Sequence, residues 1–176
     1  MRLNWKAIPI GCILVLLPAR VLCQGLTSRA ASSDDVASLD AIVAAFYDVI
    51  SHDADESIDW ARDSTLYTAD LRFKIVGANA AGGTLQLVDH ANYAAQNRDI
   101  SRGFFEREIH RVTQRFGPIA QVFSTYEWRI TRDGPIAGRG INAIELYFDG
   151  ARWWITSAMW TAESPGNPIP REYLTR

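Results

Sequence analysis

The side chains of this sequence best suited to chemistry are those of His110, Glu108, Tyr126 and Asp59. A histidine titrates near neutral pH and can act as acid or base, and a neighbouring carboxylate fixes its tautomer and raises its pKa. A tyrosine such as Tyr126 can donate a hydrogen bond to an oxygen on which negative charge develops, and Asp59 is a second candidate base. Together these residues favour proton transfer on a small molecule without a cofactor.

Residues 104–116 are expected to position two of these side chains, because their alternation is typical of a β-strand. One face of that strand carries a set of alternating residues: Glu106, Glu108, His110, Val112, Gln114 and Phe116. Val112 and Phe116 are apolar and belong in a core, so this face is predicted to point inward. The structural alternative is that His110 only pairs with a glutamate, and that the other charged residues tie neighbouring strands together.

The sequence allows two strand registers for the hairpin that follows at Gly117-Pro118. A strict two-residue turn places Thr125 opposite His110, whereas one extra residue places Tyr126 there and brings Ser124 onto the same face. Because a one-residue slip moves every side chain to the other face of the sheet, the two registers predict different pockets.

A second hairpin is predicted where Asp149-Gly150 separates two β-rich runs, since both positions of a tight turn need positive φ. A two-residue turn there gives three cross-strand pairs: Leu146 with Trp153, Ile144 with Ile155, and Asn142 with Ser157. The polar pair could bind a ligand, or Asn142 could satisfy a bulge. Trp154 and Trp160 are predicted on the opposite face, where large aromatic residues favour a dimer interface.

Ligand binding rather than catalysis is the predicted role of four residues: Trp60, Asn142, Ser157 and Ser124. Trp60 could form an aromatic wall at the mouth of a pocket, with the Asp59 carboxylate beside it. Alternatively, Trp60 could pack in the interior while Asp59 accepts a hydrogen bond from the backbone. No metal or cofactor is expected, because the three histidines have no ligand-type spacing and no phosphate-loop or serine-hydrolase pattern is present.

The N-terminal half is predicted to supply helices that cover the sheet. Ser33 or Asp34 can cap a helix that continues to Ile50, and its apolar residues recur at helical spacing: Val36, Leu39, Ile42, Val43, Phe46, Val49 and Ile50. A shorter helix is expected over 56–62, a strand over 71–76, a loop over 77–83 and a helix over 87–98. The proline-rich residues 164–170 should lie over the surface, with Tyr173 and Leu174 fixing the chain end.

Residues 1–23 have the pattern of a secretory signal peptide, with a basic start, an apolar stretch over 7–17 and a predicted cleavage site before Gln24. Residues 24–33 are then a linker, and 34–176 form a single domain. The apolar run is short for a transmembrane span, although an uncleaved anchor is the alternative. The domain is therefore expected to be exported, periplasmic or secreted, with no membrane partner after cleavage.

Cysteine content and charge exclude several classes of function. Both cysteines, Cys12 and Cys23, lie in the predicted leader, so the mature domain would have neither a disulfide nor a thiol nucleophile. The leader also holds 3 of the 18 basic residues, which leaves 15 against 20 acidic ones and a net charge near −5. Such a charge argues against a nucleic-acid partner.

Several stretches of the chain resemble the nuclear transport factor 2-like superfamily, within the SnoaL-like group and a subgroup of small uncharacterised bacterial proteins. They are Asp59-Trp60, residues 104–109, 116–120, 124–127, 139–142 and 152–155, and the ending Asn167-Pro168-Ile169-Pro170. The resemblance covers roughly residues 34–174. It implies an α+β cone, in which a strongly curved antiparallel or mixed sheet wraps around N-terminal helices and a pocket opens at the wide end. Members of the superfamily include isomerases, dehydratases, cyclases, hydrolases and non-catalytic domains, so the fold alone does not assign an activity.

Three hypotheses follow. The first is an exported cone that binds a small, mostly apolar or partly polar molecule. The second is a cofactor-free lyase or isomerase that uses His110 with a carboxylate or with Tyr126. The third is a homodimeric interaction module whose cone is filled by side chains, and a cavity below about 300 Å³ would favour it.

Overall fold

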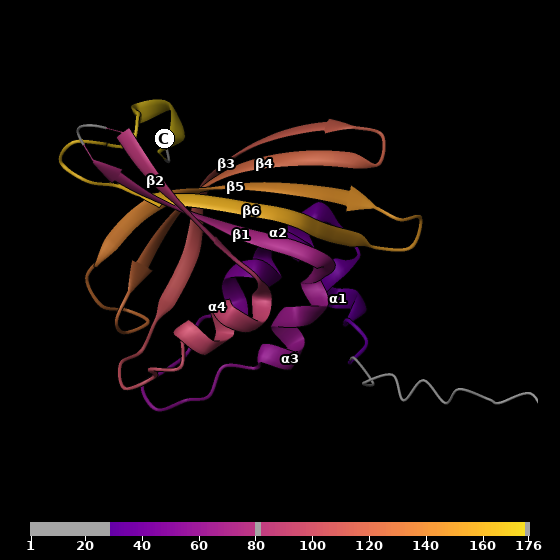
Figure 1. Cartoon of the computed structure of the whole chain (residues 1–176), viewed down its shortest axis with the longest axis horizontal. Helices are drawn as coiled ribbons and strands as arrows, with labels where there is room; N and C mark the ends of the chain where they lie inside the picture. The colour runs from indigo at the N-terminus through magenta and orange to yellow at the C-terminus, as the bar shows by residue number, and fades with distance from the viewer. Residues whose placement is uncertain (1–28, 80–81, 175–176) are drawn as a thin grey trace, which may run out of the picture.

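The computed structural model describes residues 29–79 and 82–174, so the predicted leader and the first part of the predicted linker lie outside the described residues. The described residues form a six-stranded sheet with the strand order β2-β1-β6-β5-β4-β3 (Figure 1). Its strands are β1 Tyr67–Asn79, β2 Gly82–Val88, β3 Phe105–Phe116, β4 Ile119–Arg129, β5 Gly138–Phe148 and β6 Trp153–Ala162. β1 pairs with β6 in parallel, and the other neighbours are antiparallel. The helices cover one face of the sheet, here called the inner face, as predicted for an α+β cone (Figure 1).

The long N-terminal helix of the sequence prediction is split in two. Helix α1 spans Ser33–Val36 and helix α2 spans Leu39–Asp48, because the Ser38 hydroxyl accepts a hydrogen bond from the Ala41 backbone N–H (3.0 Å) and caps a new helix. The predicted apolar face of this region is confirmed, since Ile42, Val43 and Phe46 are buried. These side chains pack against inner-face residues of the sheet such as Val122, Ile144 and Ile155.

Two further helices are shorter than predicted, and one predicted loop is a strand. Helix α3 spans Trp60–Asp63 and is followed by the 3₁₀ turn η1, Ser64–Leu66. In the stretch predicted as a loop, residues 77–79 are the end of β1 and residues 82–83 are the start of β2. Helix α4, His90–Gln96, begins after Asp89, whose carboxylate caps it by accepting a hydrogen bond from the Asn92 backbone N–H. Strand β2 forms the edge of the sheet, and its Leu85 and Leu87 side chains are exposed to solvent. The alternation of buried and exposed residues that identifies a strand in a sequence is therefore missing in β2.

A bulge at Ile109 interrupts the pairing of β3 with β4. Near the turn the strict two-residue register is confirmed, with Phe116 opposite Ile119 and Thr125 opposite His110; beyond the bulge Glu108 lies opposite Tyr126. The predicted inward set is therefore divided. Glu106 and Glu108 face inward, whereas His110, Val112, Gln114 and Phe116 lie on the outer face, where Phe116 is 84% exposed.

A second bulge, at Thr156, changes the register that was predicted for β5 and β6. The turn residues are Gly150 and Ala151, so Phe148 lies opposite Trp153 and Leu146 opposite Ile155. Beyond the bulge Asn142 pairs with Trp160, not with Ser157 as predicted. Trp160 consequently faces inward and packs against Phe73 and Tyr93. The prediction that Trp160 lies with Trp154 on an outer aromatic face is therefore wrong.

The C-terminal tail folds over the outer face of the sheet, as predicted (Figure 1). Tyr173, in the 3₁₀ turn η2 over Arg171–Tyr173, packs edge-on against Phe123, and its carbonyl accepts a hydrogen bond from the Thr125 hydroxyl (2.6 Å). None of the helices within 29–79 and 82–174 is long and apolar enough to cross a membrane.

Gly140 is required by the close packing of its neighbours. A Cβ at this position would meet the ring of Tyr126 and would lie 2.5 Å from the Thr161 carbonyl oxygen. We predict that Gly140→Ala lowers the free energy of unfolding by about 1–3 kcal/mol, since the clash displaces backbone. Urea denaturation measures this, with Gly166→Ala as the control because nothing lies within 4 Å of a Cβ there. Equal stability of the two variants would contradict the packing around Tyr126.

Candidate functional site

A small chamber lies between the helices and the inner face of the sheet and has a volume of about 190 Å³. Its lining is mostly aromatic and comes from both layers: Phe46, Ile50, Tyr67, Phe73, Tyr93, Phe104, Glu106, Tyr126, Trp128, Asn142 and Trp160. Glu106 is the one carboxylate in this lining. The chamber is therefore a largely aromatic space with a single carboxyl group in its wall.

An outer cavity of about 300 Å³, here called the vestibule, adjoins the chamber. The two spaces share four lining residues, Ile50, Tyr93, Phe104 and Trp128. The rings of Phe104 and Trp128 stack with their centroids 5.6 Å apart, so this pair forms part of the wall between vestibule and chamber. The vestibule is more polar, with His52, Asp99 and Arg102 in its lining.

The environment of Glu106 strongly favours its protonated form. Burial among the aromatic rings raises the pKa of Glu106 to about 8, and hydrogen bonding from Asn142 only partly opposes that shift. At neutral pH most molecules therefore carry an uncharged carboxylic acid at this position, and the acid ionises within one or two pH units of neutrality. This is the pKa range in which a general acid or base is most effective.

Two tyrosine hydroxyls accompany Glu106 in the chamber. Tyr126 and Tyr93 line the chamber together with Glu106. Burial raises the pKa of both tyrosines, and the charge of Glu106 raises each pKa further. Neither hydroxyl makes a hydrogen bond to another residue of the described parts of the chain. Both phenols therefore stay protonated and can donate to an oxygen atom of a bound molecule.

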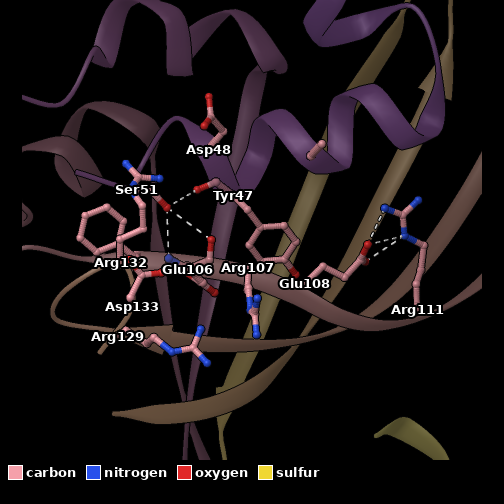
Figure 2. A pocket seen from close by; sticks show the side chains of 12 residues that line it. Tyr47, Asp48, Ser51, Glu106, Arg107, Glu108, Arg111, Arg129, Arg132 and Asp133 are labelled. Carbon is pink, nitrogen blue, oxygen red and sulfur yellow. Dashed lines mark hydrogen bonds and ion pairs between the residues drawn. The ribbon is translucent and has the colours of Figure 1, made fainter. Parts of the chain in front are cut away.

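Glu108, two residues along the same strand, has a different environment (Figure 2). Its carboxylate accepts two hydrogen bonds from Arg111 Nε (2.8 and 3.0 Å) and one from Arg111 Nη2 (2.6 Å), and Arg111 also pairs with Asp40 of α2 (2.7 Å). The Ser124 hydroxyl donates to Glu108, and Ser124 in turn bonds the Tyr47 hydroxyl (2.7 Å). This network of ion pairs and hydrogen bonds connects β3 to α2, and Glu108 therefore has a structural role.

An open groove of about 440 Å³ between α2 and β3 lies beside this network (Figure 2). The Ser51 hydroxyl accepts a hydrogen bond from the backbone N–H of Glu106 (3.1 Å), which holds the segment after α2 against β3. The groove is lined by Glu106, Glu108 and four arginines, among them Arg129 and Arg132. Glu106 therefore borders both the chamber and a solvent-open groove.

Comparison with solved structures identifies the fold. A protein of unknown function with a cystatin-like fold from Nostoc punctiforme superposes with a TM-score of 0.55 at 12% identity, over 78% of this chain and 97% of the other. A nuclear transport factor 2-like protein of unknown function from Silicibacter pomeroyi gives 0.50 at 15% identity, over 72% and 94%. The chain has the nuclear transport factor 2-like fold. A protein provisionally assigned as a ketosteroid isomerase from Parabacteroides distasonis gives 0.51 at 11% identity, over 78% and 98%.

No protein-family model matches this nuclear transport factor 2-like chain, and no curated protein matches it. The shared fold does not assign an activity, so any functional assignment has to be argued from the arrangement of the site.

Of the predicted catalytic residues, the structure places Tyr126 in the chamber and the others elsewhere. His110 lies on the outer face opposite Thr125, because the bulge at Ile109 reverses the alternation of β3. Asp59 is half exposed, caps α3 through the Arg62 backbone N–H (2.9 Å) and pairs with Arg29 (2.5 Å). The prediction of His110 with Glu108 or Asp59 as an acid–base pair is therefore wrong.

Of the predicted ligand-binding residues, Asn142 alone lines the chamber. Ser157 lies on the outer face and accepts a hydrogen bond from Lys74 Nζ (2.8 Å), a consequence of the bulge at Thr156. Trp60 packs against His90 and Tyr93, behind the chamber wall, and Ser124 is sealed inside the Glu108 network. The described residues contain no group of three or more His, Cys, Asp or Glu side chains that could hold a metal ion.

From the sequence, Glu106 is predicted to face inward, but its predicted role is only to connect neighbouring strands. Alternation along β3 identified the face correctly at this position. The distinction between Glu106 and Glu108 depends on which partner each carboxylate meets, and those partners come from α2, β4 and β5.

Replacing each glutamate with the uncharged glutamine should have opposite effects on the stability of the protein at high pH. Because burial raises the pKa of Glu106 to about 8, the folded protein keeps a proton that the unfolded chain releases at lower pH, and wild-type stability falls as pH rises toward 8. Glu106→Gln removes this loss, so its stability relative to wild type should increase by about 2–4 kcal/mol between pH 5 and pH 9 in urea denaturation.

The matched control is Glu108→Gln, which leaves Arg111 with Asp40 as its remaining carboxylate partner and should lower stability by about 1–3 kcal/mol at both pH values. If the free energies of unfolding of the wild type and Glu106→Gln differed by the same amount at every pH from 5 to 9, the raised pKa of Glu106 would be disproved.

Proposed function

We propose that this protein binds a small cyclic or branched carbonyl compound in the chamber and moves a proton on it with Glu106. The observation that carries the proposal is the single carboxyl group in an aromatic chamber, with a pKa raised to about 8 and two unpaired phenol hydroxyls beside it. No cofactor is needed for such a reaction, because proton transfer requires only an acid or base and a means of stabilising the charge that develops.

The size of the chamber restricts the molecule that can react. An apolar protein cavity of about 150 Å³ accepts benzene, so the chamber of about 190 Å³ has room for one six-membered ring with a polar substituent. A larger molecule would have to extend past Phe104 and Trp128, which line both spaces, into the vestibule of about 300 Å³. The chamber alone lies below the limit of about 300 Å³ given above, which by itself favours the filled-cone alternative. The proposal therefore needs the substrate to occupy the chamber together with the adjoining vestibule.

The proposed reaction uses the carboxyl group of Glu106 and the hydroxyls of Tyr126 and Tyr93, three residues that line the chamber. The ionised Glu106 takes a proton from the carbon next to the carbonyl group, the C–H electron pair moves to form a carbon–carbon double bond, and the carbonyl oxygen becomes negatively charged. Tyr126 and Tyr93 donate hydrogen bonds to that oxygen. The protonated Glu106 then returns the proton to the same or another carbon, which gives exchange or isomerisation. Since Glu106 also borders the open groove, its proton can exchange with solvent from that side.

Deuterium exchange on cyclohexanone in D₂O, followed by proton NMR, tests this function. The exchange rate should rise with pH and level off above about 8, because the carboxylate is the active form. Glu106→Gln should lower the rate about 100-fold or more, and Tyr126→Phe about 10- to 100-fold. Glu145→Gln, on the exposed outer face, is the control and should leave the rate unchanged.

Ligand storage without chemistry is the second candidate, favoured by the largely aromatic lining. It predicts that cyclohexanone shifts the NMR signals of chamber residues while exchange at pH 9 stays at the rate of the buffer. Absence of both binding and exchange would contradict both candidates.

We also propose that the domain acts outside the cytoplasm after removal of residues 1–23. Intact-mass measurement of the protein produced in an exporting bacterium should find a chain that begins at Gln24. Leu14→Arg, which breaks the apolar stretch, should leave the full-length chain in the cytoplasm. Recovery of uncleaved wild-type protein from the soluble cytoplasm would refute export.

A further inference from the structure

A second cavity, here called the tail cavity, lies on the outer face of the sheet beneath the C-terminal tail and has a volume of about 440 Å³. Its floor comes from four strands and includes Phe123, Ala143 and Met159, and its roof includes Ile169 and Tyr173 of the tail. Its volume lies within the range of small-molecule sites, which is roughly 300–1,000 Å³. This space has no part in the proton-transfer function proposed above.

The tail holds this cavity in place. The Thr125 hydroxyl bonds the Tyr173 carbonyl (2.6 Å), Tyr173 packs on Phe123, and the Ile169 backbone N–H bonds the Glu163 carboxylate (3.1 Å). Because the chain's own tail covers the cavity, a second protein sheet cannot lie flat against the floor. The space therefore fits a small molecule better than a second copy of this chain.

The polar groups around the cavity indicate which kind of molecule fits. The Thr161 hydroxyl is buried and has no hydrogen-bond partner among the described residues, which is costly unless a ligand supplies one. Asn167 and Glu163 also line the cavity. Glu163 is the one charged residue in the lining, so a carboxylate or phosphate would meet repulsion and no counter-ion.

We propose that the tail cavity binds a neutral, predominantly apolar molecule that carries a hydroxyl group. Its hydrocarbon part lies between the sheet floor and the Pro168–Pro170 roof, and its hydroxyl reaches the polar end formed by Thr161, Glu163 and Asn167. A hydroxyl can accept from Thr161 or Asn167 and donate to Glu163 at the same time. Trp160 is a lining residue of both this cavity and the chamber.

Met159 allows a direct test, because the chain has two methionines, Met1 and Met159, and the side chain of Met159 lines the tail cavity. The full chain is labelled with ¹³C-methyl methionine and titrated with 1-decanol as the probe. The Met159 methyl signal should shift and saturate, and it should show nuclear Overhauser contacts to decanol. Decanoate, which has the same chain length and a negative charge, should bind at least about tenfold more weakly.

Two variants and a control locate the probe. Ala143→Trp fills the floor of the cavity and should abolish the saturable shift, and Ile169→Ser in the tail should weaken binding about tenfold. Leu85→Ser, which removes an exposed apolar side chain on β2 outside this cavity, should leave the affinity unchanged. The Ile169→Ser arm keeps the test decisive if the Ala143→Trp variant does not fold.

The proposal is overturned if the Met159 methyl does not respond to decanol, or if Ile169→Ser and Leu85→Ser bind equally well. It is also overturned if the Met159 signal shifts with protein concentration in the absence of decanol, since a second copy of the chain would then occupy this face.

Discussion

The bulge at Ile109 determines which charged side chains of β3 enter the cone. Without this unpaired residue, the register of the turn end would continue along β3. Glu108 would then lie opposite Glu127, and both Glu106 and Glu108 would face outward with His110. With it, Glu106 and Glu108 face the interior, while Arg111 reaches both Glu108 and Asp40 of α2. The link between β3 and α2 therefore depends on the same irregularity that places a carboxyl group in the chamber.

Glu106 and Glu108 show how neighbouring positions on one strand acquire different chemistry. Glu108 meets a guanidinium and a hydroxyl, which stabilise its charge and restrict it to a structural role. Glu106 meets aromatic rings and one amide, so burial dominates and favours the neutral acid. The difference between the two positions comes from Arg111, which hydrogen-bonds to Glu108 and not to Glu106.

The two cavities lie on opposite faces of one sheet and meet at Trp160. Trp160 packs against Phe73 and Tyr93, and Tyr93 forms part of the wall between chamber and vestibule. The second bulge, at Thr156, turns Trp160 inward and Ser157 outward. Both candidate sites therefore depend on irregular points of the sheet, where backbone pairing shifts and side chains change face.

The sequence by itself determined the type of fold, the core face of the N-terminal helices, the β3–β4 and β5–β6 hairpins and the surface position of the tail. Local signals are sufficient for these features, because helical periodicity, strand alternation and turn residues act over a few positions. It also identified Tyr126 and Asn142 as residues of the pocket. It could not identify Glu106 as the acid of the chamber or exclude His110, since each depends on a bulge and on partners distant in the chain. A bulge leaves little trace in residue types, and the pKa of a carboxyl group is set by neighbours that only the tertiary structure brings together.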